Sequence, residues 1–564
     1  MDPSLQDVQG LRIAVEGCGH GTLNAIYSAT DKACEARSWD GVDLLIIGGD
    51  FQAVRNAYDL TVMSVPAKFR EIGDFHEYYS GRRRAPYLTI FVGGNHEASS
   101  HLWELYYGGW VAPNIYYMGA ANVVRLGPVR IAGMSGIWKG YNYNKPHHER
   151  LPYNQDDIKS IYHVRELDIR KLLQLRTQVD VGISHDWPRA IERHGDERHL
   201  FRLKPDFEQE SKDGTLGNQA ATYVMDRLRP PYWFAAHMHC KFAATKTYPD
   251  QDQVDGMADG GVIPTDLSDR NVQPPPVSNG SGAVAHNVDE IDLDMDDEDD
   301  QPGPTPTLAE PNTESTVPED VRALLPASFS RPIAQPRRTP GGPPPPSITN
   351  RTVRFLALDK CLPGRKFLQL LEILPSSPSS APLPAPTPSP DQPRYHLCYD
   401  PEWLAITRVF APSLTLGDRS AKPDPDLGEE AYLPRIEAEA AWVDENVVKA
   451  GKMTIPENFE ITAPVHEAGM PESVREGPGE YNNPQTVAFC ELVGIENRLF
   501  ATEKEREERM TQGPAPPEPR REGGFGAGRG GRRDGGRGGG RGRGRGGGRG
   551  FGSRGNGSGR GRRS

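Results

Sequence analysis

Long apolar runs and cysteines are both scarce in this chain of 564 residues, and each scarcity excludes a class of protein. No stretch approaches the roughly 18 consecutive apolar residues that a membrane-spanning helix needs, so we expect no membrane partner. The six cysteines show no framework spacing, and the N-terminal stretch MDPSLQDVQG lacks the basic and apolar regions of a signal peptide. The sequence therefore predicts a soluble intracellular protein whose thiols are reduced.

Hydrophobic residues are also few, at 36%, whereas the chain has 52 prolines and 61 glycines, so it cannot pack along its whole length. We expect four parts. Residues 1–247 form the main folded domain, and residues 351–510 form a small C-terminal domain with a Pro-rich interruption. Residues 248–350, which include the acidic run VDEIDLDMDDEDD, are a disordered insert, and residues 511–564 are a disordered Arg/Gly-rich tail.

The charge of the chain is distributed unevenly. The formal net charge is −12, but residues 521–564 contain 13 arginines against two acidic residues and carry +11. An acidic body with a basic arm is typical of proteins that bind nucleic acid. Repeated Arg and Gly, with Phe525 and Phe551 available for stacking, resemble segments that bind RNA weakly and without sequence preference. The alternative is a tail that only keeps the protein in solution.

Five short apolar runs in residues 11–247 each end in polar side chains. The runs are LRIAVEGC, VDLLIIGGD, YLTIFVGGN, VDVGISHDW and PYWFAAHMH, and helical patterns lie between them, which is typical of an α/β fold. NVVRLGPVRIAG predicts a β-hairpin around Gly127 and Pro128, so we expect a mixed sheet system. In the C-terminal part, RTVRFLALDKCLPGRKFLQLLEI predicts a strand followed by a helix-compatible run.

The polar ends of the five runs carry residue types that bind metals, namely Cys18, His20, Asp50, Asn95, His96, His185, His237 and His239. Active sites form where such residues converge at one edge of a sheet. One carboxylate, one amide, several imidazoles and a thiolate suit Zn, Fe(II) or Mn and suit Mg or Ca poorly. Two ions fit if Asp50 bridges them, and a pair of ions activates a phosphoester for attack by water. The sequence therefore predicts two divalent metal sites and phosphoester hydrolysis.

The motifs GCGHG, GGDFQ, GGNHE, SHDWP and AHMH resemble the five blocks of the calcineurin-like metallophosphoesterases. This resemblance implies a two-sheet sandwich flanked by helices. The first block of that family normally has an aspartate where this chain has Cys18, and a cysteine there is characteristic of one branch, the RNA lariat debranching enzymes. The chain resembles that branch, which implies a nuclear enzyme that hydrolyses the 2′–5′ branch linkage of excised intron lariats and releases linear introns for turnover.

The same resemblance implies roles for individual residues. One metal ion would be held by Cys18, His20, Asp50 and His239, and the other by Asp50, Asn95, His185 and His237. His96 would act as general acid at the leaving 2′-oxygen, because an imidazole exchanges protons near neutral pH. Cys18 has a second interpretation, as a small buried apolar side chain beside a single-metal site.

Residues 135–165, which include SGIWKGYNYNKPH, resemble the lariat-recognition region of that branch. Aromatic side chains stack on unpaired bases and cations bind phosphates, so this mixture is typical of single-stranded RNA recognition. The candidate RNA-binding residues are Trp138, Lys139, Tyr141, Tyr143, Lys145, His148 and Arg150. The alternative is an ordinary loop whose aromatic rings pack on the core.

Two other functions compete with lariat debranching. A phosphoprotein phosphatase of the same superfamily would have Asp in place of Cys18 and Arg in place of Gly93, before the GNHE motif. A non-catalytic RNA-binding scaffold would have lost metal ligands, whereas all of the expected positions are filled here. The sequence identifies no protein partner.

Overall fold

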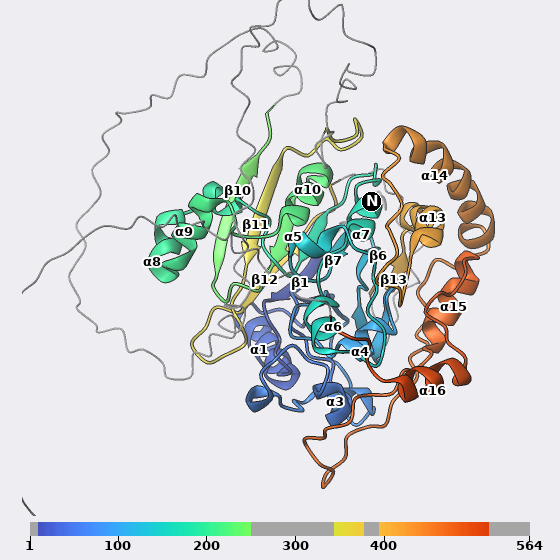
Figure 1. Ribbon diagram of the computed structural model, residues 1–564. Coiled ribbons are helices and arrows are strands. Elements are labelled where there is room, and N and C mark those ends of the chain that lie inside the picture. Colours follow the sequence, from blue (N-terminus) through green and yellow to red (C-terminus); the bar gives the residue numbers. More distant parts are fainter. Residues whose placement is uncertain (1–9, 250–342, 377–393, 518–564) are drawn as a thin grey trace, which may run out of the picture. The chain divides into compact units, whose positions relative to one another are not determined.

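Two β-sheets form the centre of the computed structural model, which describes residues 10–249, 343–376 and 394–517 (Figure 1). In spatial order, the first sheet consists of β12 (Leu368–Ile373), β1 (Leu11–Glu16), β2 (Leu44–Ile47), β3 (Thr89–Phe91), β5 (Ile115–Tyr117) and β4 (Gly109–Ala112). The second consists of β10 (Phe242–Thr247), β11 (Thr352–Ala357), β9 (Tyr232–Ala235), β8 (Val181–Ser184), β7 (Val129–Met134), β6 (Ala121–Leu126) and β13 (Leu397–Tyr399). The predicted two-sheet sandwich flanked by helices is confirmed.

Both sheets are mixed, as the sequence predicts. The inner strands β1, β2, β3 and β5 are parallel to one another, and so are β7, β8, β9 and β11. All four residues of β2, which read LLII, are buried, because a parallel strand inside a layered fold is covered on both faces. β6 and β7 form the expected hairpin, and Gly127 takes the left-handed backbone (φ 55°) that its turn requires.

Helices and short helical turns cover the sheets. The α-helices are α1 (Leu23–Ala36), α2 (Ala57–Leu60), α3 (Phe75–Tyr79), α4 (Ser99–Trp103), α5 (Gly140–Tyr143), α6 (Gln155–Ser160), α7 (Glu166–Leu172), α8 (Glu197–Leu203), α9 (Asp206–Asp213), α10 (Gln219–Leu228), α13 (Pro401–Phe410), α14 (Glu429–Val443), α15 (Pro484–Val493) and α16 (Glu503–Gln512). Residues Ala67–Phe69, Ile191–His194 and Ala411–Ser413 form 3₁₀ turns, and Asp444–Val448 form a π-helical turn. Apolar residues of α1 and α3 pack on the first sheet, whereas α7 contacts β6 of the second.

Three strands from the C-terminal part complete the two sheets. β11 lies between β9 and β10, β12 pairs with β1 at one edge, and β13 pairs with β6 at another edge. The Asp400 carboxylate caps α13 by accepting the N–H of Trp403 at 3.0 Å, and it also receives the buried guanidinium of Arg130 at 2.7 Å. Residues 352–410 are therefore built into the same layers as residues 11–247.

The expected helix-compatible run in GRKFLQLLEI is a strand, β12, and that prediction is wrong. Leu370 packs in the cluster that faces α1, whereas its neighbours Leu371 and Ile373 pack in the cluster between the sheets. Apolar side chains on both faces remove the alternation that identifies a half-buried strand, so the run resembles one face of a helix.

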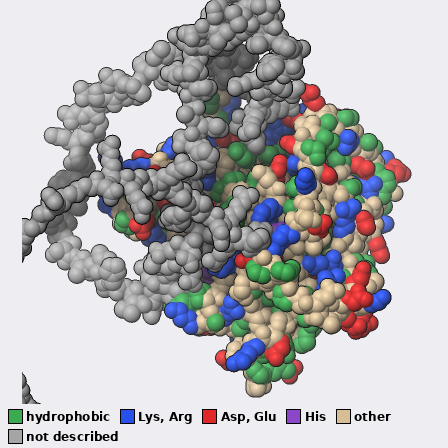
Figure 2. All heavy atoms as spheres, viewed as in Figure 1, with side chains coloured by type: hydrophobic (Ala, Val, Ile, Leu, Met, Phe, Trp, Pro, Cys, Tyr) green, Lys and Arg blue, Asp and Glu red, His purple; other side chains and the backbone are tan. Residues whose placement is uncertain are grey.

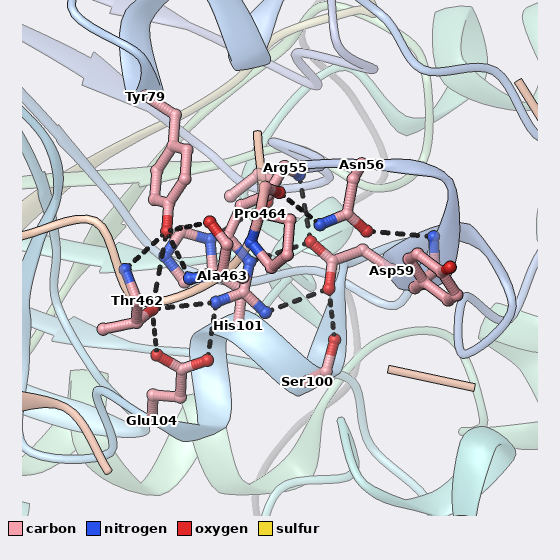
Figure 3. A network of polar contacts seen from close by, with 12 residues as sticks. Arg55, Asn56, Asp59, Tyr79, Ser100, His101, Glu104, Thr462, Ala463 and Pro464 are labelled. Atoms are coloured by element: carbon pink, nitrogen blue, oxygen red, sulfur yellow. Dashed lines mark hydrogen bonds and ion pairs between the residues drawn. The ribbon is translucent and has the colours of Figure 1, made fainter. Parts of the chain in front are cut away.

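A segment of the C-terminal part, residues 456–466, lies on the side of the molecule that carries the first sheet. We call this segment the strap. The Tyr79 hydroxyl accepts the backbone N–H groups of Thr462 and Ala463 at 2.7 and 2.9 Å (Figure 3). Arg55, which is fully buried, lies between Asp59 and Glu104, and Glu104 also accepts the Thr462 hydroxyl at 2.8 Å (Figure 3).

The strap also holds the backbone that follows Asp50, the polar residue after β2. The N–H of His466 donates to the carbonyl of Arg55 at 2.8 Å, and the Asn56 amide donates to the carbonyl of Pro464 at 2.5 Å. A buried ion pair keeps its geometry because breaking it leaves an uncompensated charge. The strap therefore fixes the loop that runs from Asp50 to Asn56.

Parts of two predicted disordered regions, residues 250–342 and 518–564, lie outside the described residues, and so do residues 377–393 of the Pro-rich interruption. Within the described ranges, no helix combines the length and the apolar character that crossing a membrane requires.

Candidate metal centre

The polar tips of five strands meet at one place because of strand direction. β1, β2 and β3 run parallel in one sheet, and β8 and β9 run parallel in the other. The carboxyl ends of parallel strands lie at the same edge of a sheet, so side chains just after them converge. All eight candidate residues at these tips are brought together in this way.

Four of these side chains form a first cluster. One donor atom from each of Cys18, His20, Asp50 and His239 lies within 4.8 Å of all the others. The Nε2 atoms of His20 and His239 are 3.3 Å apart. The Cys18 thiol is buried and accepts the backbone N–H of His237 at 3.2 Å. Thiolate, imidazole and carboxylate together are the donor set that borderline divalent metals prefer.

A second cluster lies on the other side of Asp50. Nε2 of His185 is 3.3 Å from the Asn95 side-chain oxygen and 3.4 Å from Oδ1 of Asp50. The ring of His237 is 4.9 Å from that of His185 between centroids. Nδ1 of His185 lies 2.9 Å from the carbonyl of Gly48, which fixes the proton on Nδ1 and leaves the Nε2 lone pair facing the cluster.

Asp50 connects the two clusters through its two oxygens. Oδ2 lies 3.8 Å from Nε2 of His20, whereas Oδ1 lies 3.4 Å from Nε2 of His185 and accepts the backbone N–H of His96 at 2.9 Å. The carboxylate is 1% exposed. One buried carboxylate with an oxygen toward each cluster is the arrangement needed for a bridging ligand.

The backbone is left-handed at several of these tips. His20, Asp50, His237 and His239 have φ values of 42°, 46°, 62° and 47°, and Gln52 has φ 61°. Non-glycine residues rarely adopt this conformation, which costs on the order of 1–2 kcal/mol each. Such strain gathers at functional sites, where the surrounding structure holds it in place. It lets side chains that follow a strand turn back toward a common point.

The electrostatics of the centre favour a bound cation. Burial lowers the pKa of His20 to about 4 and also lowers the pKa of His185, so both imidazoles are neutral near pH 7 and can donate a lone pair. Burial, together with the charge of Asp50, raises the pKa of the Cys18 thiol well above its usual value. A thiol in this position ionises only opposite a positive charge, and a metal supplies that charge.

Glu97 was missed by the sequence analysis although it ends the GGNHE motif. Its buried carboxylate accepts the N–H groups of Phe51, Gln52 and Gly94 at 2.8, 2.8 and 2.9 Å. It therefore ties the loop after Asp50 to the loop before Asn95. The sequence shows only that an acidic residue ends the motif, and acidic residues are equally common on solvated surfaces.

Two more side chains support the centre. The side-chain Nε2 atom of Gln52 lies 3.3 Å from Nδ1 of His20, whose other ring nitrogen faces His239. Glu16 at the end of β1 is fully buried, and neither carboxylate oxygen has a hydrogen-bond partner among the described residues. Burial and the charge of Asp50 raise its pKa well above the usual value.

His96, the candidate general acid, lies at the edge of the first cluster. Its ring centroid is 5.8 Å from that of His20, and the residue is 5% exposed. Its Nδ1 atom is buried and has no hydrogen-bond partner within the described residues. The side chain is thus near the metal-binding atoms without being one of the donors in either cluster.

The candidate RNA-binding loop, residues 135–165, divides into exposed and buried parts. Tyr141 is 63% exposed, and Lys139, Lys145, Trp138 and Tyr143 are partly exposed. The guanidinium of Arg189 lies 5.8 Å from the Trp138 ring. Figure 2 shows basic side chains near α5 and acidic ones at the edge formed by α16. Trp138 and Tyr143 also pack against the core, as the alternative interpretation expects, whereas Tyr141 is mostly exposed.

His148 and Arg150 both have internal partners in the structure, and their contact with RNA stays a prediction. His148 is 7% exposed, and its Nε2 atom lies 3.5 Å from the Glu149 carboxylate. Arg150 donates to Glu480 at 2.9 Å, more than 300 residues along the chain. The charge of Arg150 is thus paired within the protein, and burial lowers the pKa of His148 below its usual value.

The fold and the site together define a metallophosphoesterase. Residues 11–241 match the family described as calcineurin-like phosphoesterase, whose members bind divalent metals, and residues 350–498 match the lariat debranching enzyme C-terminal domain. The chain belongs to the lariat debranching enzyme family.

Curated relatives are similar over most of their length. The lariat debranching enzyme of Schizosaccharomyces pombe is 40% identical over 86% of this chain and 96% of its own length. The Arabidopsis thaliana enzyme is 36% identical over 86% of each chain, and the Homo sapiens enzyme is 35% identical over 88% of this chain and 72% of its own length. The resemblance and the fold class inferred from the motifs are confirmed.

Glu97→Gln is expected to weaken metal binding by roughly 10- to 100-fold, because an amide group cannot accept all three backbone N–H groups that the carboxylate holds. The measurement is the metal retained after dialysis against a chelator, with thermal unfolding recorded in parallel. Glu35→Gln on the exposed face of α1 is the matched control. Retention equal to that of the wild type would mean that Glu97 does not support the centre.

Proposed function

We propose that the chain hydrolyses the 2′–5′ phosphodiester at the branch nucleotide of excised intron lariats, and that it does so at the centre built around Asp50. The products are a linear intron with a free 2′-hydroxyl at the branch nucleotide and a 5′-phosphate on the released end. The observation that carries this proposal is the pair of donor clusters on either side of one buried carboxylate, with a cysteine in the first. The same role implies that the protein works in the nucleus.

Two divalent metal ions are proposed for the two clusters. Cys18, His20, Asp50 and His239 would hold one ion, and Asp50, Asn95, His185 and His237 the other. Bound there, such ions activate the phosphate and the attacking water. The soft Cys18 thiolate favours Zn or Fe(II) in the first cluster, whereas the oxygen-richer second cluster also suits Mn.

The residues of the chain supply proton transfer and binding. His96 donates a proton to the leaving 2′-oxygen from its position beside the clusters. Trp138, Tyr141 and Tyr143 stack on bases near the branch, and Lys139 and Lys145 bind phosphates. The basic tail, residues 521–564, adds a sequence-independent contact with RNA.

A synthetic 2′–5′ branched RNA, tested with a panel of divalent metals, is the direct assay. We expect cleavage of the branch linkage and no release of phosphate from a phosphopeptide. The reverse result would identify a phosphoprotein phosphatase, and metal-free protein without either activity would identify a scaffold.

His96→Ala is expected to lower the turnover of branched RNA by roughly 10²- to 10⁴-fold while metal content stays normal, because only proton donation is lost. A substrate whose 2′-oxygen is replaced by sulfur is the control, since a thiolate leaves without protonation and should be cleaved almost equally by both proteins. Loss of metal in the variant would instead make His96 a ligand.

Cys18→Asp is expected to keep the fold and to move the order of metal preference from Zn or Fe(II) toward Mn, because a hard carboxylate replaces a soft thiolate. The measurement is activity across a metal series, with Cys34→Ser on α1 as a control that changes a buried thiol elsewhere. An unchanged order would return Cys18 to the role of a small buried side chain.

Deletion of residues 521–564 is expected to leave cleavage of a short branched oligonucleotide intact and to weaken binding of long unbranched RNA. The dependence of that binding on salt should flatten, because 13 arginines that release counterions are gone. Affinity is measured at several salt concentrations with and without the tail. Equal slopes would reduce the tail to a solubilising segment.

A further inference from the structure

A loop from the C-terminal part lies directly against the first ligand cluster. It joins β11 to β12, and its residues 359–361 continue the hydrogen-bonded ladder beside Cys18. The N–H of Cys18 donates to the carbonyl of Asp359 at 3.4 Å, and the N–H of Cys361 donates to the carbonyl of Cys18 at 3.2 Å. A Cβ atom on Gly17 would lie 2.1 Å from the carbonyl oxygen of Asp359, so only glycine permits this approach.

Lys360 is the residue that this ladder places opposite Cys18, in a parallel bridge. Paired residues on neighbouring strands lie about 4.7–4.9 Å apart and direct their side chains to the same face. The Lys360 side chain is partly exposed, and its ammonium group has no hydrogen bond or ion pair within the described ranges. An unpaired cation therefore lies at the margin of the first cluster.

The charge of Lys360 acts on the ligand cluster itself. Burial is the main reason why the pKa values of His20 and His239 are low, and the positive charge of Lys360 lowers both further. The ammonium group belongs to the residue that lies opposite Cys18 in the ladder, and it is not one of the proposed metal ligands.

Other cations surround Lys360, and we call the group the basic rim: Lys204, Lys241, Lys360, Arg365 and Lys366. Burial raises the pKa of Asp359 even though Arg365, Lys360 and Lys204 all act to lower it, so these three cations face one carboxylate. Arg365 lies 3.5 Å from that carboxylate. Burial lowers the pKa of Lys241, and the neighbouring charge of Lys366 lowers it further.

The rim is made by three separate parts of the chain: the end of α8, the turn before β10, and the β11–β12 loop. In Figure 1 the loop and α8 lie on the same side of the sheets, away from α14. A single small anion is usually held by groups that converge on one point. Cations spread over three elements beside a phosphodiesterase centre instead suit a series of phosphates.

We propose that one arm of the branched RNA leaves the metal centre over the basic rim, with Lys360 binding the phosphate next to the scissile one. This inference rests on the proposed function, because only a branched substrate brings three arms to one phosphodiester. The loop of residues 135–165 takes bases on its exposed aromatic rings, and the rim takes the backbone of a different arm.

The test compares Lys360→Gln, the charge-preserving Lys360→Arg, and the control Lys449→Gln, which removes an exposed lysine beyond α14. For a branched RNA with three arms at low salt, Lys360→Gln should lower kcat/KM about tenfold and flatten its salt dependence by about 0.7 in log–log slope, the value for one phosphate contact. Lys360→Arg should retain most activity, and the metal content of all variants should equal that of the wild type.

Three further substrates locate the contact: one lacks the 5′ arm, one lacks the 3′ arm, and in the third the 2′ arm is cut back to the single nucleotide beyond the scissile phosphate. The defect of Lys360→Gln should disappear for one of the three and persist for the other two. The proposed phosphate contact is overturned if Lys360→Gln matches Lys449→Gln in rate and in salt slope, or if Lys360→Gln loses metal. Cleavage by the wild-type protein would in that case still support the proposed function. A wild-type protein that fails to cleave branched RNA overturns both.

Discussion

The position of the Asp50 carboxylate decides how the rest of this molecule is arranged. Its buried negative charge lies between the two donor clusters, and each oxygen faces one cluster. Burial alone would raise the pKa of this carboxyl, but the positive charges that the surrounding imidazoles carry when protonated, those of His185 and His96 foremost, hold it well below its usual value. The loops that follow the strands of both sheets must therefore converge at this point, and the backbone of Asp50 takes a left-handed conformation there.

The ligand set was predictable from the sequence because its chemistry is local. Each candidate ligand follows an apolar run by a few residues. Parallel strands bring such positions together, so no knowledge of long-range contacts is needed to predict that the ligands converge. Glu97 and Gln52 were not found, because their role depends on backbone N–H groups and a ring nitrogen contributed by other loops. The strand β12 was misassigned because its partner β1 lies some 350 residues earlier, and the two apolar faces of the run hide its alternation.

The RNA-facing surface was harder to predict than the metal centre. A basic side chain next to aromatic ones is compatible with a phosphate contact or with an internal ion pair, and only tertiary contacts distinguish the two. Arg150 pairs with Glu480, whereas Lys360, which the motifs did not single out, has no such partner in the described chain. In a protein with a net charge of −12, RNA is repelled on average, so local groups of cations decide where it can approach.

The strap and the β11–β12 loop have a consequence for how the protein is made. Every candidate ligand lies before residue 240, yet the backbone of Cys18 is held by residues 359–361, and the loop after Asp50 is held by residues 462–466. On the ribosome, these supports emerge long after the ligands that they position. A nascent or prematurely terminated chain thus contains the full set of metal-binding side chains without the contacts that fix two of their loops. Completion of the centre is in this way coupled to completion of the chain.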